Sequence, residues 1–127
     1  MTELFAVFVG GGVGALIRFL LSNALNPVVI SPHLLGVPLG TLVANWGGSL
    51  LLGILVGLFP VSTPLKLALT TGLMGGLTTF STFSIESAHL LTSGAILKTI
   101  THMILHVGGG LMLATLGLNL GLHYGKS

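Results

Sequence analysis

The chain has 127 residues, of which 52% are hydrophobic and 5% are charged, and its formal net charge is +2. Soluble domains carry about 25% charged residues, so this composition excludes an ordinary water-soluble domain and favours a protein whose solvent is lipid. The absence of cysteine excludes a disulfide framework, a zinc–thiolate cluster and a thiol nucleophile. The few basic residues are too scattered for a nucleic-acid surface, so we expect no nucleic-acid partner.

Four apolar segments are long enough to cross a bilayer, which requires about 20 mostly apolar residues. Their approximate bounds are residues 4–23, 38–59, 65–92 and 95–123. The connections between them are too short for a soluble domain. The sequence therefore predicts an all-α integral membrane protein in which residues 1–127 form a single transmembrane domain of four antiparallel helices. A cleaved signal peptide is not expected, because Met1-Thr2-Glu3 offers no basic residue before the first apolar segment.

Small residues recur four positions apart in the apolar segments, as in Gly53/Gly57 and Gly72/Gly76. Such pairs favour close helix packing, either within one subunit or between subunits. Four helices enclose little interior, so a pore or pocket forms more easily between subunits and we expect an oligomer. The basic residues are nearly balanced between the two predicted sides, which leaves the orientation in the membrane poorly encoded. Insertion in both orientations and a chance cancellation of charges are equally open.

The third apolar segment contains the most unusual run of the chain, Gly75-Gly76-Leu77-Thr78-Thr79-Phe80-Ser81-Thr82-Phe83. Glycine and threonine both disfavour helix, so the run predicts a third helix broken near its middle. A break frees backbone groups that must bind protein, water or an ion. The freed carbonyls are hard ligands for a small cation, and the start of the following half-helix attracts an anion.

Two aromatic rings follow this predicted break. Phe80 and Phe83 are three residues apart and therefore share a helix face. The edge of an aromatic ring carries partial positive charge, and the hydroxyls of Thr79, Ser81 and Thr82 are nearby donors. Such weak, uncharged contacts suit conduction, because an ion must enter and also leave. Taken alone, however, these residues favour ordinary ring packing with hydroxyls bonded to their own helix.

Other polar residues lie inside or beside the apolar segments. Asn45 is either a polar contact between helices or a ligand for an ion. Arg18 is either an interfacial anchor or a residue that attracts anions to a vestibule. Glu86 follows Phe83 by three positions and is expected on the same polar surface. His102 and His106 have the i, i+4 spacing of a metal pair, but no third ligand is evident, so polar packing is the better interpretation.

At this point the chain resembles the CrcB/Fluc family of fluoride channels. The resemblance covers essentially the whole chain and is carried by three runs, namely Gly10-Gly11-Gly12-Val13-Gly14-Ala15-Leu16-Ile17-Arg18-Phe19, Pro38-Leu39-Gly40-Thr41-Leu42-Val43-Ala44-Asn45-Trp46-Gly47-Gly48, and the Gly75 to Phe83 run. It implies a channel, not an enzyme, that lets fluoride leave the cytoplasm passively and so relieves fluoride toxicity. It also implies a multi-pass protein in the lipid bilayer of a bacterial or archaeal plasma membrane.

The resemblance further implies an antiparallel, dual-topology dimer with two fluoride pores along the subunit interface. On this pattern Asn45 lines a pore, and Phe80 and Phe83 contribute ring edges. The backbone carbonyls of Gly75 and Thr78 match positions that hold a structural Na⁺ at the dimer centre. The hydroxyls of Thr79, Ser81 and Thr82 lie nearby, whereas Arg18 and Glu86 are assigned only to a vestibule or to support.

The predicted fourth helix departs from the family pattern, which has hydroxyls at four-residue spacing. His106, Gly110 and Ala114 occupy those positions here, and Thr115 is one position away. Either His106 substitutes for a hydroxyl in the fluoride pathway, or one pathway is altered. We therefore expect a homodimer, with a heterodimer formed with a paralogue as the alternative.

Two other functions compete with the channel. A proton-coupled exporter of the small multidrug-resistance type also has four short helices, but it requires a carboxylate embedded in the first helix. The internal acid here is Glu86, in the third apolar segment. A structural membrane subunit would explain the many glycines, but it would not explain the combination of phenylalanine, hydroxyl and asparagine side chains.

Overall fold

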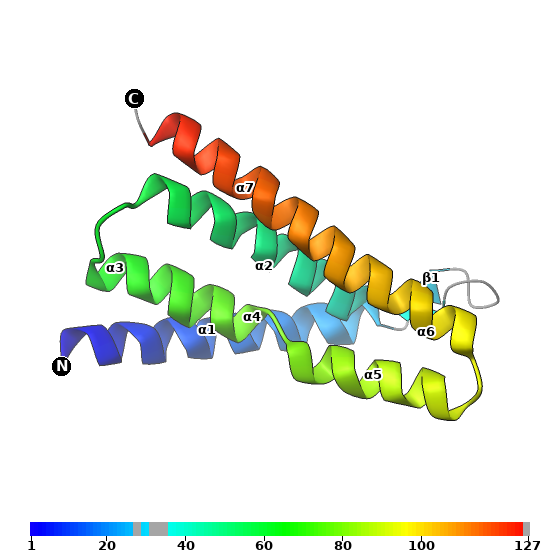
Figure 1. Cartoon of the computed structure of the whole chain (residues 1–127). Coiled ribbons are helices and arrows are strands. Elements are labelled where there is room, and N and C mark those ends of the chain that lie inside the picture. Colours follow the sequence, from blue (N-terminus) through cyan, green and yellow to red (C-terminus); the bar gives the residue numbers. More distant parts are fainter. Residues whose placement is uncertain (27–28, 31–35, 126–127) are drawn as a thin grey trace.

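The computed structural model describes residues 1–26, 29–30 and 36–125, which are mostly helical (Figure 1). Among the described residues, three continuous helical runs are long and apolar enough to cross a membrane. They are α1 (Thr2–Leu25), α2 (Leu39–Leu58), and the run made of α6 (Ile96–Met103), η3 (Ile104–Gly109) and α7 (Gly110–Tyr124). Figure 1 shows that α1 begins and α7 ends at the same end of the bundle. The chain is thus an all-α, multi-pass membrane protein.

The segment predicted at 65–92 is divided into several pieces. It comprises α3 (Pro64–Leu67), the π-helical η2 (Ala68–Met74), α4 (Gly75–Leu77) and α5 (Phe80–Thr92). Between α4 and α5, Thr78 has a ψ of 153° and Thr79 has φ and ψ of −148° and 117°, which is extended backbone. In Figure 1 the chain leaves the axis of α4 at this point and α5 continues along a displaced path.

Local signals explain where these helical pieces start and stop. Thr63 precedes α3 and its hydroxyl accepts a hydrogen bond from the backbone N–H of Lys66, while Pro64 occupies the first helical position. Gly94, between α5 and α6, has a φ of 75°, a conformation that a side chain would disfavour. The chain can therefore reverse direction here within very few residues.

A short antiparallel pair precedes α2 and was not predicted. Strands β1 (Val29–Ile30) and β2 (Val37–Pro38) pair with Val29 opposite Pro38. Pro38 is also the N-cap of α2, close to the predicted start of that helix. The backbone of Gly36, which leads into β2, has a φ of 60°.

The glycine pairs act within the subunit. A Cβ atom at Gly14 would overlap backbone atoms of Leu73 and Leu77, so α1 contacts η2 and α4 backbone to backbone. In the same way, a Cβ at Gly53 would meet the backbone of Leu118, which places α2 directly against α7. Such close approach is the usual reason for small residues between membrane helices.

The interior of the bundle contains polar residues beside its apolar ones, whereas many large apolar side chains lie on the surface. Its fully or nearly buried polar residues are Thr41, Thr70, Thr79, Thr99, His102 and His106. By contrast, α1 exposes large apolar side chains such as Phe8, Leu16 and Phe19. Polar groups inside and apolar groups outside suit a protein surrounded by lipid, and they direct attention to the polar interior.

Candidate functional site

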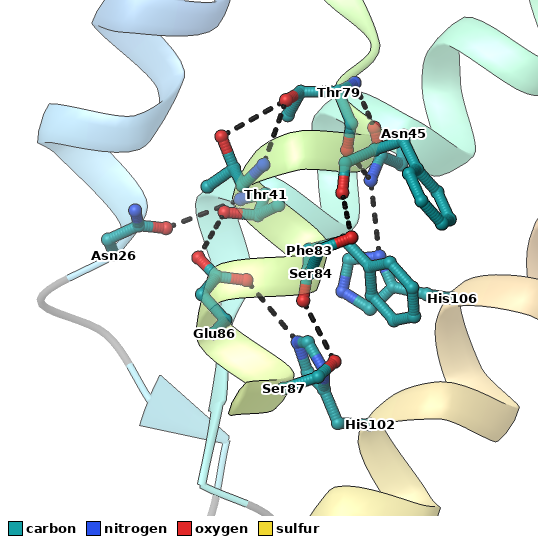
Figure 2. A network of polar contacts seen from close by, with 12 residues as sticks. Asn26, Thr41, Asn45, Thr79, Phe83, Ser84, Glu86, Ser87, His102 and His106 are labelled. Atoms are coloured by element: carbon teal, nitrogen blue, oxygen red, sulfur yellow. Dashed lines mark hydrogen bonds and ion pairs between the residues drawn. The ribbon is translucent and has the colours of Figure 1, made fainter. Parts of the chain in front are cut away.

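The interruption between α4 and α5 is held by one side chain of α2. The backbone N–H of Thr79 donates to Oδ1 of Asn45 at 2.7 Å, and Nδ2 of Asn45 donates to the carbonyl of Thr79 at 3.1 Å (Figure 2). Both backbone groups that leave the helical pattern at Thr79 are therefore satisfied by the same amide. Such compensation is required where non-helical backbone lies at membrane depth.

The start of α5 carries a cluster of hydroxyls. Thr79 is its N-cap, and Oγ1 of Thr79 accepts from the backbone N–H of Thr82 at 3.2 Å. The same oxygen donates to Oγ1 of Thr82 at 3.0 Å and lies 3.1 Å from Oγ of Ser81. The predicted alternative, hydroxyls bonded to their own helix, holds instead for Ser84, whose Oγ donates to the carbonyl of Phe80.

These bonds leave two carbonyls without their usual helical donors. In a continuous helix, the carbonyl of Gly75 would accept from the N–H of Thr79, and that of Thr78 from the N–H of Thr82. Both N–H groups donate to side chains instead, one to Asn45 and one to Thr79. Gly75 is exposed, and a Cβ placed on it would have open space around it.

Arg18 contacts the same region from α1. Its Nε donates to the carbonyl of Gly76 at 3.0 Å, and the side chain is part-buried. A hydrogen bond from a charged donor is stronger than one between neutral groups. Arg18 therefore supports the last residues of α4, where the helix ends.

An open groove of about 460 Å³ lies beside the interruption. Its lining carries no Asp, Glu, Lys or Arg and consists of Asn45, Ser49, Leu52, Thr78, Thr79, Phe80, Phe83, His106, Val107, Gly110, Leu111 and Ala114. The hydroxyls of Thr78 and Thr79 donate to the carbonyl of Met74 and to Oγ1 of Thr82, so a bound ion would compete with these bonds, and the remainder of the wall is mainly apolar. A site of this kind can remove water from a small anion without holding it by full charge.

The two phenylalanine rings lie in different surroundings. Their centroids are 5.5 Å apart with the rings tilted by 50°, as expected for residues on one helix face. Phe83 is buried, with only 6% of its surface exposed, whereas Phe80 is 78% exposed. Phe83 therefore belongs to the wall of this subunit, and Phe80 projects away from it.

Three residues of the predicted fourth helix that were considered above line the groove. His106, Gly110 and Ala114 line the groove, while the hydroxyl of Thr115 donates to the carbonyl of Leu111 in its own helix. Ser49, which the sequence analysis did not single out, contributes a hydroxyl from α2. Its spacing of four residues from Asn45 is the signal that could have identified it.

The hydrogen bonds of Asn45 indicate which ring nitrogen of His106 carries the proton. Oδ1 of Asn45 must be the acceptor from Thr79, so Nδ2 of Asn45 faces Nδ1 of His106 at 3.2 Å. Since Nδ2 is a donor, Nδ1 of a neutral His106 accepts and Nε2 carries the proton. The Nε2 atom is buried and has no hydrogen-bond partner among the described residues.

Glu86 belongs to a second polar group, which joins α2, α5 and α6. Its Oε1 accepts from Oγ1 of Thr41 at 2.7 Å, and its Oε2 lies 3.3 Å from Nε2 of His102. On the other side of the His102 ring, Nδ1 lies 3.0 Å from Oγ of Ser87 (Figure 2). The sequence analysis named no third residue beside His102 and His106; the structure brings Glu86 to them.

The structure thus defines a class of protein: a multi-pass helical membrane protein with an uncharged groove beside an interrupted helix. Residues 5–118 match the family described as CrcB-like protein, Camphor Resistance (CrcB), and the chain belongs to that family. It is 40% identical over 124 residues to the fluoride-specific ion channel FluC of Serratia proteamaculans, with 94% of each chain covered. It is 44% identical over 119 residues to the FluC protein of Escherichia coli O1:K1, with 91% and 90% of the two chains covered.

A further relative shows a similar level of identity. The fluoride-specific ion channel FluC of Aromatoleum aromaticum is 43% identical over 121 residues, which cover 92% of this chain and 88% of that protein. These relatives are named as ion channels and not as enzymes or drug exporters. The family expected from the sequence is confirmed, and the exporter alternative receives no support.

Proposed function

We propose that this chain forms a fluoride-selective channel that lets fluoride leave the cytoplasm down its electrochemical gradient. The observation that carries the proposal is the groove beside Thr79, which combines amide and hydroxyl donors with two phenylalanine rings and no charged side chain. The names of the relatives support the choice of fluoride among the halides. Uncharged donors can replace the hydration shell of an ion and still release it, as conduction requires.

In this proposal Asn45 is the main donor of the pathway. One hydrogen of its amide donates to the carbonyl of Thr79, and the second faces Nδ1 of His106. A fluoride ion in the groove would accept that second hydrogen in place of the histidine nitrogen. His106 then takes the position at which the family pattern has a hydroxyl, and it remains a neutral neighbour of the ion.

The start of α5 supplies the remaining attraction. The partial positive charge at the N-terminus of a helix favours an anion, and we place the hydroxyls of Ser81 and Thr82, which contact Oγ1 of Thr79, beside the pathway and outside the lining of the groove. The ring edges of Phe80 and Phe83 provide weak positive potential on the apolar side. We assign Arg18 and Glu86 to support, because each binds protein groups that hold the helices in place.

We propose four membrane crossings, with α3, η2, α4 and α5 together forming the third. The two half-helices meet at Thr78 and Thr79, where the groove lies. The antiparallel, dual-topology homodimer in the plasma membrane is proposed on two grounds. The groove is open on one side, and Phe80 is 78% exposed beside it, so a second copy of the chain would complete the wall.

A heterodimer remains the second candidate assembly. It is favoured by Gly110 and Ala114, which line the groove where hydroxyls are expected. In a heterodimer, an unlike chain would supply a fourth helix with hydroxyls at the expected four-residue spacing. Activity of this chain reconstituted alone would establish the homodimer, and activity only beside a paralogue would establish the heterodimer.

The proposed structural Na⁺ fits the groups at the interruption. The carbonyls of Gly75 and Thr78 have lost their helical donors to Asn45 and Thr79 and are hard oxygen ligands of the kind that bind small cations. Bound there, Na⁺ would offset the negative ends of these carbonyl dipoles and hold two interrupted helices together at the dimer centre.

The proposal is tested in a bacterial strain that lacks its own fluoride exporters. Expression of this chain should allow growth at fluoride concentrations that stop the parent strain, because passive exit prevents accumulation of the anion. A chain that reaches the membrane and gives no protection, either alone or beside a paralogue, would contradict the proposal. Protection against cationic drugs instead of fluoride would favour the exporter.

A further inference from the structure

Three buried polar atoms lie together; two of them, Oε2 of Glu86 and Nε2 of His102, form an ion-pair contact of 3.3 Å, and none has a hydrogen bond among the described residues. Among the described residues, the buried side-chain nitrogens and oxygens in this condition are Oε2 of Glu86, Nε2 of His102 and Nε2 of His106. Each of these residues offers a ligand atom within 4.8 Å of the other two. Figure 2 shows the ends of Glu86 and His102 directed at one another, with His106 beside them. Buried polar atoms are nearly always satisfied, so one bound species at this point would account for all three.

The second polar atom of each of these three side chains already contacts a neighbouring side chain. The three contacts are Oε1 of Glu86 with Oγ1 of Thr41 at 2.7 Å, Nδ1 of His102 with Oγ of Ser87 at 3.0 Å, and Nδ1 of His106 with Nδ2 of Asn45 at 3.2 Å. The contacts to Glu86 and His102 fit the outer layer of hydrogen bonds that orients ligands in metal sites, whereas the contact from Asn45 to His106 has the opposite polarity.

We propose that Glu86, His102 and His106 bind one divalent transition-metal ion, for which Zn²⁺ is the best match. Two imidazoles and one carboxylate form the ligand set of zinc sites that keep a fourth position for water. Mg²⁺ and Ca²⁺ prefer sites made of oxygen ligands and do not fit this set. The site is distinct from the carbonyls proposed for Na⁺, but it shares His106 with the proposed fluoride pathway, so its test measures bound zinc and not fluoride transport.

The distances require little rearrangement. In a tetrahedral site with bonds of about 2.0–2.1 Å, neighbouring ligand atoms are about 3.3 Å apart. Nε2 of His102 and Oε2 of Glu86 are already 3.3 Å apart. Nε2 of His106 is the atom that must move closer to the other two. His106 lies at the start of the π-helical η3, which follows α6.

The protonation of His106 must change when the metal binds. Coordination by Nε2 places the ring proton on Nδ1, which then repels Nδ2 of Asn45. His106 therefore gives up one neutral hydrogen bond, a small loss beside coordination of a divalent cation. For His102 no such conflict exists, because Oγ of Ser87 donates to the carbonyl of Phe83 and can accept from Nδ1.

The position of the cluster gives an ion a short route from water. His102 lies six residues after Ile96, the first residue of α6, which corresponds to about 9 Å along a helix. The turn at Gly94, which joins α5 to α6, marks that end of the bundle (Figure 1). An ion from the aqueous phase therefore need not cross the whole membrane.

Zinc binding to the purified full chain tests the proposal. After equilibrium dialysis against micromolar ZnSO₄ and measurement of zinc by atomic emission, we expect one Zn²⁺ per chain. Co²⁺ should replace it with the absorption of a tetrahedral site. His102→Gln and Glu86→Gln should weaken binding at least about tenfold, whereas His89→Gln and His123→Gln remove an exposed histidine and should leave it unchanged.

Ser87→Ala provides an independent variant that leaves all three ligands in place. It removes the contact to Nδ1 of His102, and loss of such a contact lowers metal affinity by about 10–100-fold. Size-exclusion chromatography identifies any variant that fails to fold. If a ligand variant does not fold, the zinc affinity of Ser87→Ala tests the proposal in its place. A wild-type chain that retains no zinc would overturn the proposal and would leave Glu86 and His102 as a proton-sharing pair. Equal affinity in the wild type, His102→Gln and Ser87→Ala would overturn it as well.

Discussion

Asn45 and Thr79 bind each other at two points, although 34 positions separate them in the sequence. The side-chain amide of Asn45 pairs with the backbone of Thr79 much as a neighbouring strand would. Both backbone groups of Thr79 are therefore satisfied from α2. This pair places a polar groove inside a membrane protein without leaving the backbone of Thr79 unbonded.

Replacing Asn45 with alanine should destabilise the protein. The change removes both bonds to Thr79, whose side chain and backbone lie in the interior. An unsatisfied buried donor or acceptor costs about 1–3 kcal/mol, so we expect a lower melting temperature in detergent together with slower fluoride efflux. Asn119→Ala is the matched control, because Asn119 is exposed on α7. Equal melting of the two variants would show that the amide does not hold the interruption.

The two phenylalanines should respond differently to substitution. Phe83→Ile should lower both stability and fluoride flux, because the ring is buried against His106, with centroids 5.0 Å apart. Phe80→Ile should lower flux with little effect on subunit stability, since the ring is 78% exposed. Loss of about 1.4 kcal/mol at the barrier corresponds to about tenfold slower flux. Unchanged flux in both variants, measured beside the control Phe19→Ile at an exposed ring of α1 away from the groove lining, would remove the proposed role of the ring edges.

Two glycines of α1 provide a matched test of helix packing. Gly14→Ala should cost about 1–3 kcal/mol, because the new Cβ would overlap the backbone of Leu73. Gly12→Ala has open space and should be neutral or stabilise the helix by up to about 1 kcal/mol. Thermal unfolding followed by circular dichroism distinguishes them. The reverse order of stability would mean that α1 does not contact η2 and α4 as described.

Dual topology can be tested directly because the chain contains no cysteine. Ser93→Cys places a single thiol in the exposed turn between α5 and α6. If the chain inserts in both orientations, an impermeant maleimide added to sealed cells should label about half of the molecules, as nearly balanced Lys and Arg suggest. Labelling of all molecules, or of none until the cells are permeabilised, would show a single orientation.

The sequence was most informative where local chemistry decides the structure. The apolar length of residues 4–23 corresponds to α1, and the Gly75 to Phe83 run contains the two extended residues, Thr78 and Thr79. Hydrophobic length and helix propensity are properties of a few neighbouring residues, so a single sequence expresses them. The pairing of β1 with β2 was missed because two-residue strands leave no periodic signal.

Contacts between distant residues were the part that the sequence did not reveal. Nothing in the spacing of His102 and His106 shows that Glu86 faces them, because that contact depends on how α5 packs against α6. The same holds for Arg18, which was assigned to a vestibule or to support and whose bond to the carbonyl of Gly76 could not be read from the sequence. Helix packing decides which side chains meet, and it is set by the whole bundle.

Halide flux from vesicles that contain only this chain tests the central claim most directly. Liposomes loaded with equal KF and KCl, with valinomycin to balance charge, are followed simultaneously with fluoride and chloride electrodes. An uncharged groove of donors and ring edges predicts rapid loss of fluoride while chloride is retained, and slower loss of fluoride with Asn45→Ala. Retention of both halides by the folded wild-type protein, or their equal release, would contradict the account.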